Sequence, residues 1–506
     1  MILSRYTLKN ISSKVSGIPS EAMFELPEKV LQFGTGVLLR GLPDYFINKA
    51  NQMGIFNGRI VVVKSTSTGN SSAFERQDGL YTLCVRGLKN GEKVEENIIN
   101  SSISRVLSAK EDWEEILECA HDQNMQVIIS NTTEVGIQLV NEDIRHHPPV
   151  SYPGKLLAFL YERYKAFNGS KNSGMVIVPT ELIVDNGKRL QSIVLELAHL
   201  NSLEVAFIDW LECCNEFCNS LVDRIVPGKP DAEELTKLER ELGYEDQLLT
   251  MSEVYSLWAI EGSEEIKNVL SFYQADEGVV IAPDIDLHRE LKLRLLNGTH
   301  TLSCALAFLA GCETVKQAMN DETVSNFIAD VMQNEIAPSI PYKIDPKTTY
   351  DFAAKVLDRF RNPQIKHNWI SITVQISSKM KLRCIPVLLT HYKNNNTPPE
   401  LFSLGFASYI YFMKVAGESN EKFYGERDGQ QYSIQDDLAE VFKERWKNSD
   451  TNTVVNQTLK DVTFWGEDLT LLNGFADSVY QKLKLIMQNG VKQTIQSVHL
   501  NKEIIA

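Results

Sequence analysis

One long apolar segment carries three polar residues that burial in a core does not explain. Residues 287–311 have the sequence LHRELKLRLLNGTHTLSCALAFLAG, which is typical of a buried helix except for Lys292, Asn297 and His300. At about 100° per residue, an α-helix places Asn297 about 140° and His300 about 80° around from Lys292. The three side chains therefore share one broad face over about two turns. Buried polar groups without partners are costly, so this face needs a structural or a chemical reason.

Spacing alone leaves two interpretations of this face open. In a functional site, a partly desolvated lysine gives a proton to a developing alkoxide, while an amide and an imidazole N–H stabilise the same oxygen. In a structural role, Lys292 extends its ammonium group to solvent, and the Asn297-Gly298 pair marks a kink or a helix end. The first interpretation predicts carbonyl chemistry, and the second predicts an ordinary core helix.

Length, charge and cysteine content limit the class of protein. A chain of 506 residues is too long for one core, so two or three domains are expected. The formal net charge of −15 argues against nucleic acid and anionic membranes as partners, although a small anionic substrate needs only a local group of cations. We expect a soluble cytoplasmic protein, because no membrane span or signal-peptide core is found. Eight scattered cysteines without C-x-x-C spacing indicate reduced thiols and no metal site.

The first part of the chain has the pattern of a parallel α/β domain. In residues 29–40, KVLQFGTGVLLR, a short apolar strand is followed by Gly34-Thr35-Gly36 and a helix. This order is typical of a dinucleotide site, where glycines let the backbone approach a pyrophosphate. Leu39 replaces the third glycine of G-x-G-x-x-G, so a generic strand–helix turn is the alternative.

Later strands of this domain also end in polar residues. The strand 59–64 ends at Lys64, where an acidic residue would favour NAD, so this position leaves NAD and NADP open. A second strand is followed by small polar residues, which are Asn131, Thr132 and Thr133. Ligands of open α/β sheets bind at such strand ends. These residues are therefore expected either to contact a cofactor or to form a hydrogen-bonded turn.

Beyond about residue 284 the pattern changes to helices. Amphipathic segments follow one another, with a possible strand or loop at 370–374. We therefore predict an α/β chain with a Rossmann-like parallel-sheet domain over residues 1–284 and a mostly α-helical domain over residues 285–506. The segment with Lys292 lies at the predicted junction, and clefts between domains are the usual place for a cofactor to meet a substrate.

Four motifs together resemble the mannitol dehydrogenase family of polyol-specific long-chain dehydrogenases. They are QFGTGxxxR at 32–40, DGLY at 78–81, NSLVDRIVP at 219–227, and Lys-x4-Asn-x2-His at 292–300. The resemblance implies that Lys292 is the general acid/base, that Asn297 and His300 stabilise the oxyanion, that NAD is the cofactor and that no metal is used. It also implies that Asp223 of the VDRI motif and Arg359 of the R-F-x-N-P motif lie near the substrate.

A dinucleotide-binding domain predicts the residues that contact the cofactor. They belong to the glycine turn and to the strand ends: Phe33, Gly34, Thr35, Gly36, Arg40, Lys64, Asn131, Thr132 and Thr133.

Within this family, the chain is most similar to the branch that reduces tagaturonate. The similarity rests on residues 129–137, 152–156, 181–183 and 359–363. Leu182 stands where polyol dehydrogenases carry an asparagine that holds sugar hydroxyls, which disfavours a plain polyol. A uronate also needs a cation to bind its carboxylate, and the forked guanidinium of arginine is the side chain that matches a carboxylate best.

The segment 359–379 contains several cations, namely Arg359, Arg361, His367 and Lys379, and we expect Arg359 or Arg361 to bind the carboxylate. The predicted activity is therefore the NAD(H)-dependent reduction of tagaturonate to altronate, with a small sugar acid as the partner. A fructuronate reductase or a mannitol-type dehydrogenase is the first alternative. A non-catalytic nucleotide-binding sensor is the second.

Overall fold

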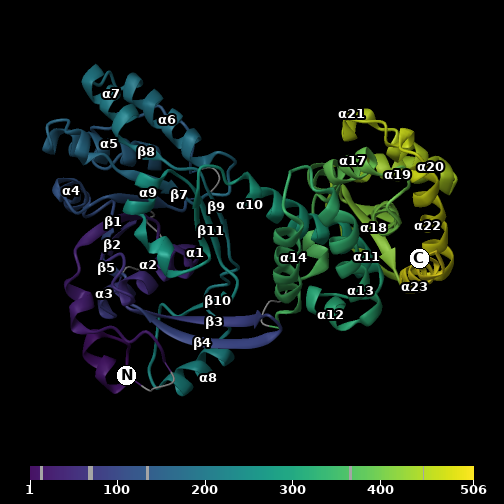
Figure 1. Ribbon diagram of the computed structural model, residues 1–506, viewed down its shortest axis with the longest axis horizontal. Helices are drawn as coiled ribbons and strands as arrows, with labels where there is room; N and C mark the ends of the chain where they lie inside the picture. Colours follow the sequence, from purple (N-terminus) through teal and green to yellow (C-terminus); the bar gives the residue numbers. More distant parts are fainter. Residues whose placement is uncertain (12–14, 66–71, 133–135, 364–366, 448, 506) are drawn as a thin grey trace. The chain divides into compact units, whose positions relative to one another are not determined.

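Two compact units make up the chain. The computed structural model describes residues 1–11, 15–65, 72–132, 136–363, 367–447 and 449–505. The first unit comprises residues 1–87 and 93–285, and the second comprises residues 88–92 and 286–506. In Figure 1 the first unit is coloured purple to teal, and the second unit is coloured green to yellow beyond residue 286. Among the described residues, no helix is long and apolar enough to cross a membrane.

A six-stranded parallel sheet forms the centre of the first unit. Its strand order is β5-β2-β1-β6-β7-β8, and every pairing is parallel. The chain goes from β1 to β2 on one side and later crosses to β6 on the other, so the order reverses beside β1. This confirms the predicted Rossmann-like domain. The strands are β1 (Glu28–Phe33), β2 (Arg59–Lys64), β5 (Ile103–Ser108), β6 (Val127–Ser130), β7 (Val176–Pro179) and β8 (Glu216–Phe217).

Alternation of side chains along the strands gives this sheet two buried faces. Leu31 and Phe33 of β1 belong to one core cluster, which also contains residues of α4, α5, α6 and α7. Val30 belongs to another, with residues of α2 and of two smaller sheets. Successive strand residues point to opposite faces, and helices or sheets must cover both. The helices are α1 (Val37–Gly41), α2 (Pro43–Gln52), α3 (Ser72–Arg76), α4 (Trp113–Glu118), α5 (Tyr152–Ala166), α6 (Asn186–Leu200), α7 (Val205–Cys214), α8 (Ala232–Leu242) and α9 (Glu264–Val269).

The two smaller sheets of this unit have three strands each. Their orders are β10-β3-β4 and β12-β11-β9. The strands are β3 (Tyr81–Lys89), β4 (Glu92–Asn100), β9 (Ser220–Asp223), β10 (Thr250–Glu253), β11 (Leu257–Glu261) and β12 (Val279–Ala282).

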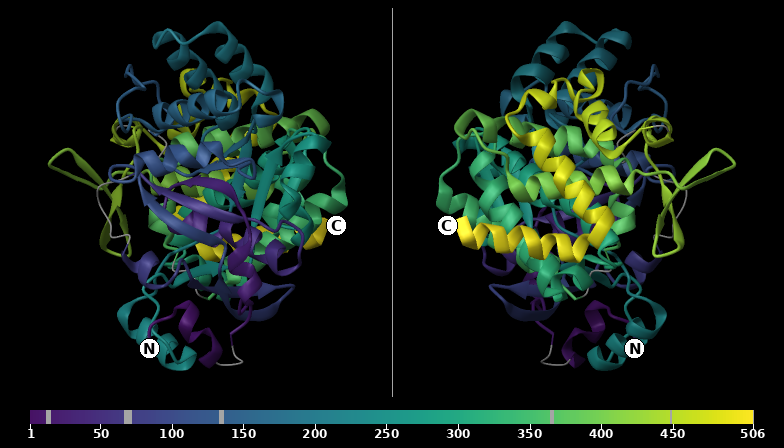
Figure 2. Two further views of the ribbon diagram at one scale, coloured as in Figure 1. Left: turned by 90° about the vertical axis from the view of Figure 1, so that its left-hand side faces the viewer. Right: turned by 90° about the vertical axis from the view of Figure 1, so that its right-hand side faces the viewer.

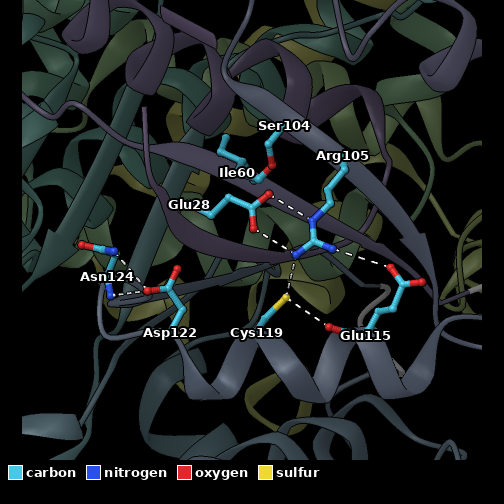
Figure 3. Close-up of polar contacts among 8 residues, drawn as sticks. All are labelled: Glu28, Ile60, Ser104, Arg105, Glu115, Cys119, Asp122 and Asn124. Carbon is cyan, nitrogen blue, oxygen red and sulfur yellow. Dashed lines mark hydrogen bonds and ion pairs between the residues drawn. The ribbon is translucent and has the colours of Figure 1, made fainter. Parts of the chain in front are cut away.

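A polar network closes the amino-terminal edge of the central sheet (Figure 3). Arg105 of β5 donates to both carboxylate oxygens of Glu28 on β1, each at 3.0 Å. Its guanidinium also lies 3.6 Å from Glu115 of α4 and donates to the Cys119 sulfur at 3.5 Å. Burial raises the pKa of the Cys119 thiol to about 11, so this cysteine is a neutral acceptor and not a reactive thiolate. The network fixes the edge opposite the predicted cofactor residues.

Helices make up most of the second unit, as predicted. Residues 369–372 form the short helix α15, so the possible strand at 370–374 is wrong there. The helices are α10 (Asp286–Leu291), α11 (Thr299–Leu309), α12 (Val315–Asn320), α13 (Glu322–Asp330), α14 (Pro346–Arg361), α15 (Trp369–Ile372), α16 (Ile376–Lys379), α17 (Ile385–Asn394), α18 (Glu400–Phe412), α19 (Ala439–Lys447), α20 (Thr451–Leu459), α21 (Val462–Trp465), α22 (Phe475–Asn489) and α23 (Val491–Ile505), with the π-helices η6 (Lys292–Gly298), η7 (Val331–Ile336) and η9 (Met380–Cys384).

The helical unit also contains a small antiparallel sheet that the sequence did not predict. Its strands are β13 (Gly417–Ser419), β14 (Lys422–Arg427) and β15 (Gln430–Ile434). The hairpin of β14 and β15 projects from the helices in both views of Figure 2. Arg427 on β14 donates to the carbonyl of Phe308 at 2.8 Å, and so binds the carboxyl-terminal end of α11.

α11 is fixed by a close contact with α18. A Cβ added at Gly405 of α18 would lie only 2.6 Å from Leu302 Cγ and 2.8 Å from the Leu302 carbonyl oxygen. Only glycine therefore allows the two helices to approach this closely. The amino terminus of α18 is held in turn by buried Glu335, whose carboxylate accepts from the backbone N–H groups of Leu401 at 3.0 Å and Phe402 at 2.7 Å.

In the first unit, Asp44 is a fully buried acid at the start of α2 whose surroundings favour the neutral form. Gln32 Nε2 donates to one of its carboxyl oxygens at 3.5 Å. The other oxygen, and Gln32 Oε1, have no hydrogen-bond partner among the described residues. Burial raises the pKa of Asp44 to about 8, against the opposing charge of Arg40. A protonated carboxyl group can donate a hydrogen bond, which an ionised carboxylate cannot. The neutral form of Asp44 therefore suits a site in which nearby acceptor oxygens have no partner.

The substitution Asp44→Asn is expected to remove one pH-dependent contribution to stability. The unfolded chain releases this proton near about pH 4, whereas the folded chain keeps it to about pH 8. Stability of the wild type therefore falls as pH rises through this window, by at most about 1.4 kcal/mol per pH unit. Thermal unfolding of both proteins at about pH 5 and about pH 8 measures the difference. The variant should gain on the wild type at the higher pH, and a difference independent of pH would contradict a neutral Asp44.

Candidate active site

The helix that carries Lys292, Asn297 and His300 contains a π-helical turn. α10 continues into η6 and then into α11, with right-handed helical backbone at Leu291 and Thr299. Hydrogen bonds from residue i to i+5 place residues five apart nearly above one another. Lys292 and Asn297 are five apart, so the expected separation of about 140° is wrong, because it assumed α-helical geometry throughout. The π-turn brings these two side chains toward one line on the helix surface.

Aromatic rings enclose His300 on α11. Its ring stacks on Phe360 of α14, with 4.1 Å between centroids and 16° between planes. His367 and Trp369 meet the ring edge-on, with centroids at 5.2 Å and 5.8 Å. These contacts fix the plane of the imidazole, so the direction of its ring nitrogens is set before a ligand binds.

His300 is held in its neutral form. Burial lowers its pKa well below the ordinary value, and the charges of His367, Arg359 and Arg383 lower it further. Its Nε2 atom is buried and has no hydrogen-bond partner among the described residues. A buried polar atom without a partner is uncommon in native proteins. Here it is a group prepared to hydrogen-bond with a ligand.

The two arginines predicted to bind a carboxylate lie on opposite faces of α14. Two residues turn a helix by about 200°, so Arg359 and Arg361 cannot point the same way. Arg359 is buried, and its charge lowers the pKa values of His300 and His367. The Arg361 side chain is 48% exposed and lies 3.9 Å from Asp358. Of the two, only Arg359 contributes to the lowered pKa of His300.

A second π-helix places two more cations near α11. η9 follows α16, and the Cys384 sulfur at its end contacts the Gly298 carbonyl of η6 at 3.6 Å. Arg383 Nη1 donates to Thr301 Oγ1 at 3.0 Å, and Lys379 Nζ donates to the Ile372 carbonyl at 2.9 Å. Burial lowers the pKa of both side chains, and the charge of Arg383 lowers that of Lys379 further. Sequence reasoning did not single out Arg383, although it stands among apolar residues.

Arg294 fixes the backbone of η9 against this helix. Its Nη1 donates to the carbonyls of Leu382 at 2.6 Å and Arg383 at 3.0 Å. Its own charge is paired with Glu290 one turn earlier, at 2.9 Å. Arg294 is therefore a structural arginine.

In the first unit, the glycine turn lies at the carboxyl end of β1. Gly34 has a φ of +128°, and an added Cβ would lie 2.9 Å from Leu39 Cδ1 and 3.1 Å from the Asn131 carbonyl oxygen. Gly36 has an ordinary φ of −64°, is exposed, and an added Cβ would meet nothing within 4 Å. Gly34 is thus required by the backbone itself. Gly36 leaves open space in front of α1.

Arg40 and Phe33 support this turn from within the protein. Arg40 donates to the Thr35 carbonyl at 2.8 Å and to Thr250 Oγ1 at 3.2 Å. The Phe33 ring is buried in the core, 5.1 Å from that of Tyr152. Only the backbone of Phe33 is therefore placed to contact a cofactor.

The predicted polar residues after the other strands lie at the same edge of the sheet. Lys64 ends β2, half-buried, and its carbonyl accepts from Ala109 at 2.9 Å. After β6, Asn131 Nδ2 donates to Thr180 Oγ1 at 2.9 Å, and the Thr132 N–H donates to Glu181 at 2.8 Å. The structure is compatible with both interpretations of this segment, a cofactor contact and a hydrogen-bonded turn. The turn is present, and it lies at the edge of the sheet where a ligand is expected. Thr133 lies outside the described residues.

Asp223 and Arg224 are buried neighbours at the end of β9, and the two side chains have different roles. Arg224 donates to the carbonyls of Glu253 at 2.9 Å and Gly41 at 2.6 Å, and its guanidinium lies 4.5 Å from the centre of the Tyr45 ring. These contacts make Arg224 a structural link within the first unit. Asp223 is 7% exposed at the end of its strand. Among the described residues, no group of three or more His, Cys, Asp or Glu side chains could hold a metal ion.

Comparison with known proteins identifies the family of both units. Residues 28–271 match the mannitol dehydrogenase Rossmann domain, and residues 284–487 match the mannitol dehydrogenase C-terminal domain. A Halalkalibacterium halodurans protein named altronate oxidoreductase is 37% identical over 484 residues, covering 94% of each chain. The Bacillus subtilis protein of the same name is 38% identical over 477 residues, covering 93% of this chain and 95% of that protein.

Solved structures show the same fold. The ternary complex of Pseudomonas fluorescens mannitol 2-dehydrogenase with NAD and D-mannitol matches with a TM-score of 0.66 and 21% identity, covering 99% of this chain and 100% of that chain. A substrate-free D-sorbitol dehydrogenase matches with a TM-score of 0.78 and 20% identity, covering 98% and 100%. Both matches extend over the two units, and the family models cover most of the sequence. The chain therefore belongs to the mannitol dehydrogenase family.

Proposed function

We propose that this chain catalyses the reversible, NAD(H)-dependent reduction of tagaturonate to altronate. Relatives that are 36–38% identical over at least 93% of the chain bear the name altronate oxidoreductase. The structural observation that carries the proposal is the neutral His300 on the helix of Lys292 and Asn297, with buried Arg359 and half-buried Arg383 acting on it. Such a site suits the carbonyl oxygen of an anionic sugar.

Each of the three polar residues of this helix has a different role at the substrate oxygen. A neutral imidazole is a poor proton donor but a good hydrogen-bond donor, so His300 holds the oxygen and does not protonate it. Asn297 supplies a second N–H to the same oxygen. Lys292 gives the proton as negative charge develops there, and takes it back when the alcohol is oxidised.

The first unit offers a surface for the dinucleotide. The open space at Gly36 lets the backbone approach a pyrophosphate, and the neighbouring strand ends bring Lys64, Asn131 and Thr132 to the same edge. Bound NAD(H) supplies or accepts the hydride. We assign Gly34, Thr35 and Gly36 to its phosphates, with Arg40 holding the turn in place.

The remaining assignments concern the substrate and the compartment. We propose Arg359 and Asp223 as substrate contacts, and we omit Arg361 because its side chain is half exposed. All eight cysteines have free thiols. Free thiols persist in a reducing cytoplasm, which is the compartment that we propose.

The two glycines of the turn allow a matched test of the cofactor site. Gly36→Ala is expected to fold normally and to weaken NADH binding about 10-fold or more, because the methyl group fills the space left for the pyrophosphate. Gly34→Ala is expected to lower the thermal midpoint as well, because its φ is +128° and its Cβ has no room. Fluorescence titration with NADH and thermal unfolding measure the two effects. Full NADH affinity in Gly36→Ala would place the cofactor elsewhere.

Removal of the proposed proton donor tests the mechanism. Lys292→Ala is expected to reduce kcat by about 100- to 10,000-fold while leaving NADH affinity unchanged, because the lysine acts on the substrate oxygen alone. Lys347→Ala is the matched control, since that lysine is exposed and pairs with Asp351 at 3.2 Å. Steady-state kinetics at saturating substrate are the measurement. Turnover of Lys292→Ala at the wild-type rate would refute the mechanism.

The substrate is tested by a panel of carbonyl compounds. Loss of NADH absorbance is expected with tagaturonate, and much slower loss with fructuronate and fructose at equal concentration. NADPH in place of NADH tests the cofactor preference in the same assay. Faster turnover of fructuronate or fructose would keep Lys292, Asn297 and His300 in their roles but overturn the proposed substrate. A protein that binds NADH and reduces none of the panel would favour a sensor.

A further inference from the structure

Arg383 is placed to contact whatever binds beside His300. Its Nη1 donates to Thr301 Oγ1, and Thr301 follows His300 directly on α11. Thr301 Oγ1 donates in turn to the Asn297 carbonyl at 2.8 Å, so the guanidinium is anchored to the turn that carries Asn297. Its charge also contributes to the lowered pKa of His300.

No acidic side chain pairs with Arg383 among the residues that the structure describes. The Thr301 hydroxyl is its one hydrogen-bond acceptor there, although a guanidinium has five N–H donors. Lys379, the neighbouring cation, donates to a backbone carbonyl and likewise forms no ion pair within that part of the chain. Four other cations of this unit, which are Arg294, Arg427, Arg445 and Lys482, do have carboxylate partners.

A partly buried arginine without a counter-ion is costly unless an anion binds to it. The guanidinium fork matches a carboxylate in shape, with two parallel N–H groups for its two oxygens. We propose that Arg383 binds the carboxylate of the sugar-acid substrate, with Lys379 as a second cation. This inference rests on the proposed function, and it replaces Arg361 as the residue that distinguishes a uronate from an uncharged ketose.

The two π-helices explain how this arrangement reaches both ends of one substrate. η6 presents Lys292 and Asn297 to the carbonyl oxygen, and η9 presents Arg383. The Cys384–Gly298 contact and the bonds of Arg294 to the η9 carbonyls fix one π-helix against the other. The carboxylate anchor and the reacting group are therefore held by neighbouring backbones, which sets the register of the sugar chain.

The test compares tagaturonate with tagatose, the uncharged ketose in which a hydroxymethyl group replaces the carboxylate. Arg383→Met keeps an unbranched apolar stem at this position and removes the charge and the N–H donors of the guanidinium. We expect the KM for tagaturonate to rise about 10- to 100-fold, with a smaller change in kcat, as for the loss of a charge-assisted hydrogen bond. Turnover of tagatose should change less than about threefold, and Arg383→Lys should restore part of the lost affinity.

The matched control is Lys381→Gln, which removes a positive charge two residues away on the same π-helix. Lys381 lies over the Phe464 ring at 5.3 Å, so its loss should leave both substrates unaffected. Should Arg383→Met fold poorly by thermal unfolding, Thr301→Val removes the anchor instead and should raise the KM for tagaturonate alone.

The outcomes separate this inference from the proposed function. A wild type that does not reduce tagaturonate refutes the function. A wild type that does, together with Arg383→Met and Thr301→Val variants whose KM stays within about twofold, refutes the role of Arg383. Equal losses on tagaturonate and tagatose in a folded variant would also refute it, because they would indicate a general structural role.

Discussion

The region around His300 depends on positive charge gathered about an imidazole that stays uncharged. Burial and the charges of Arg359, His367 and Arg383 all oppose protonation of His300. The aromatic ring of Phe360, stacked on the imidazole, covers one face of that ring and fixes its plane. A cation at this position would repel its neighbours, so the neutral form is the one that the fold can hold. A neutral imidazole can donate a hydrogen bond to an oxygen without giving up a proton, which agrees with the proposal that Lys292 is the proton donor.

The helix that carries His300 is held in place by close packing away from the imidazole itself. Gly405 lets α18 contact α11 at Leu302, Glu335 holds the start of α18, and Arg427 binds the end of α11. The polar atoms near His300 are less well satisfied. Thr299 Oγ1, His300 Nε2, Ser303 Oγ and Trp369 Nε1 are all buried without hydrogen-bond partners in the described part of the chain. Stability gained by the packing offsets the cost of these unpartnered groups, which a substrate can relieve.

Sequence reasoning predicted those features that rest on local pattern. The short apolar strands and the glycine turn predicted the Rossmann-like sheet, and the helical periodicity predicted the second unit. The π-turn at Lys292 was missed, because no residue pattern marks a change from i+4 to i+5 hydrogen bonding. Arg361 was chosen beside Arg359 because proximity in sequence hides the opposite faces of a helix. Arg383 was missed because its neighbours in space, Thr301 and His300, are about eighty residues away in sequence.

In the first unit, the groups that stabilise the central sheet and the backbone that is open to a ligand lie at opposite edges of that sheet. At the amino-terminal edge, Arg105 joins β5 to Glu28 and to α4, so its donors are satisfied within the protein. At the carboxyl edge, Gly36 is exposed in front of α1, with nothing near the position of its missing Cβ. Parallel strands make this division possible, because all their carboxyl ends meet at one edge. Polar groups paired at one edge support the sheet, and backbone left open at the other is available to a cofactor. The second unit repeats this division, with Arg294 paired to Glu290 and Arg383 left for an anion.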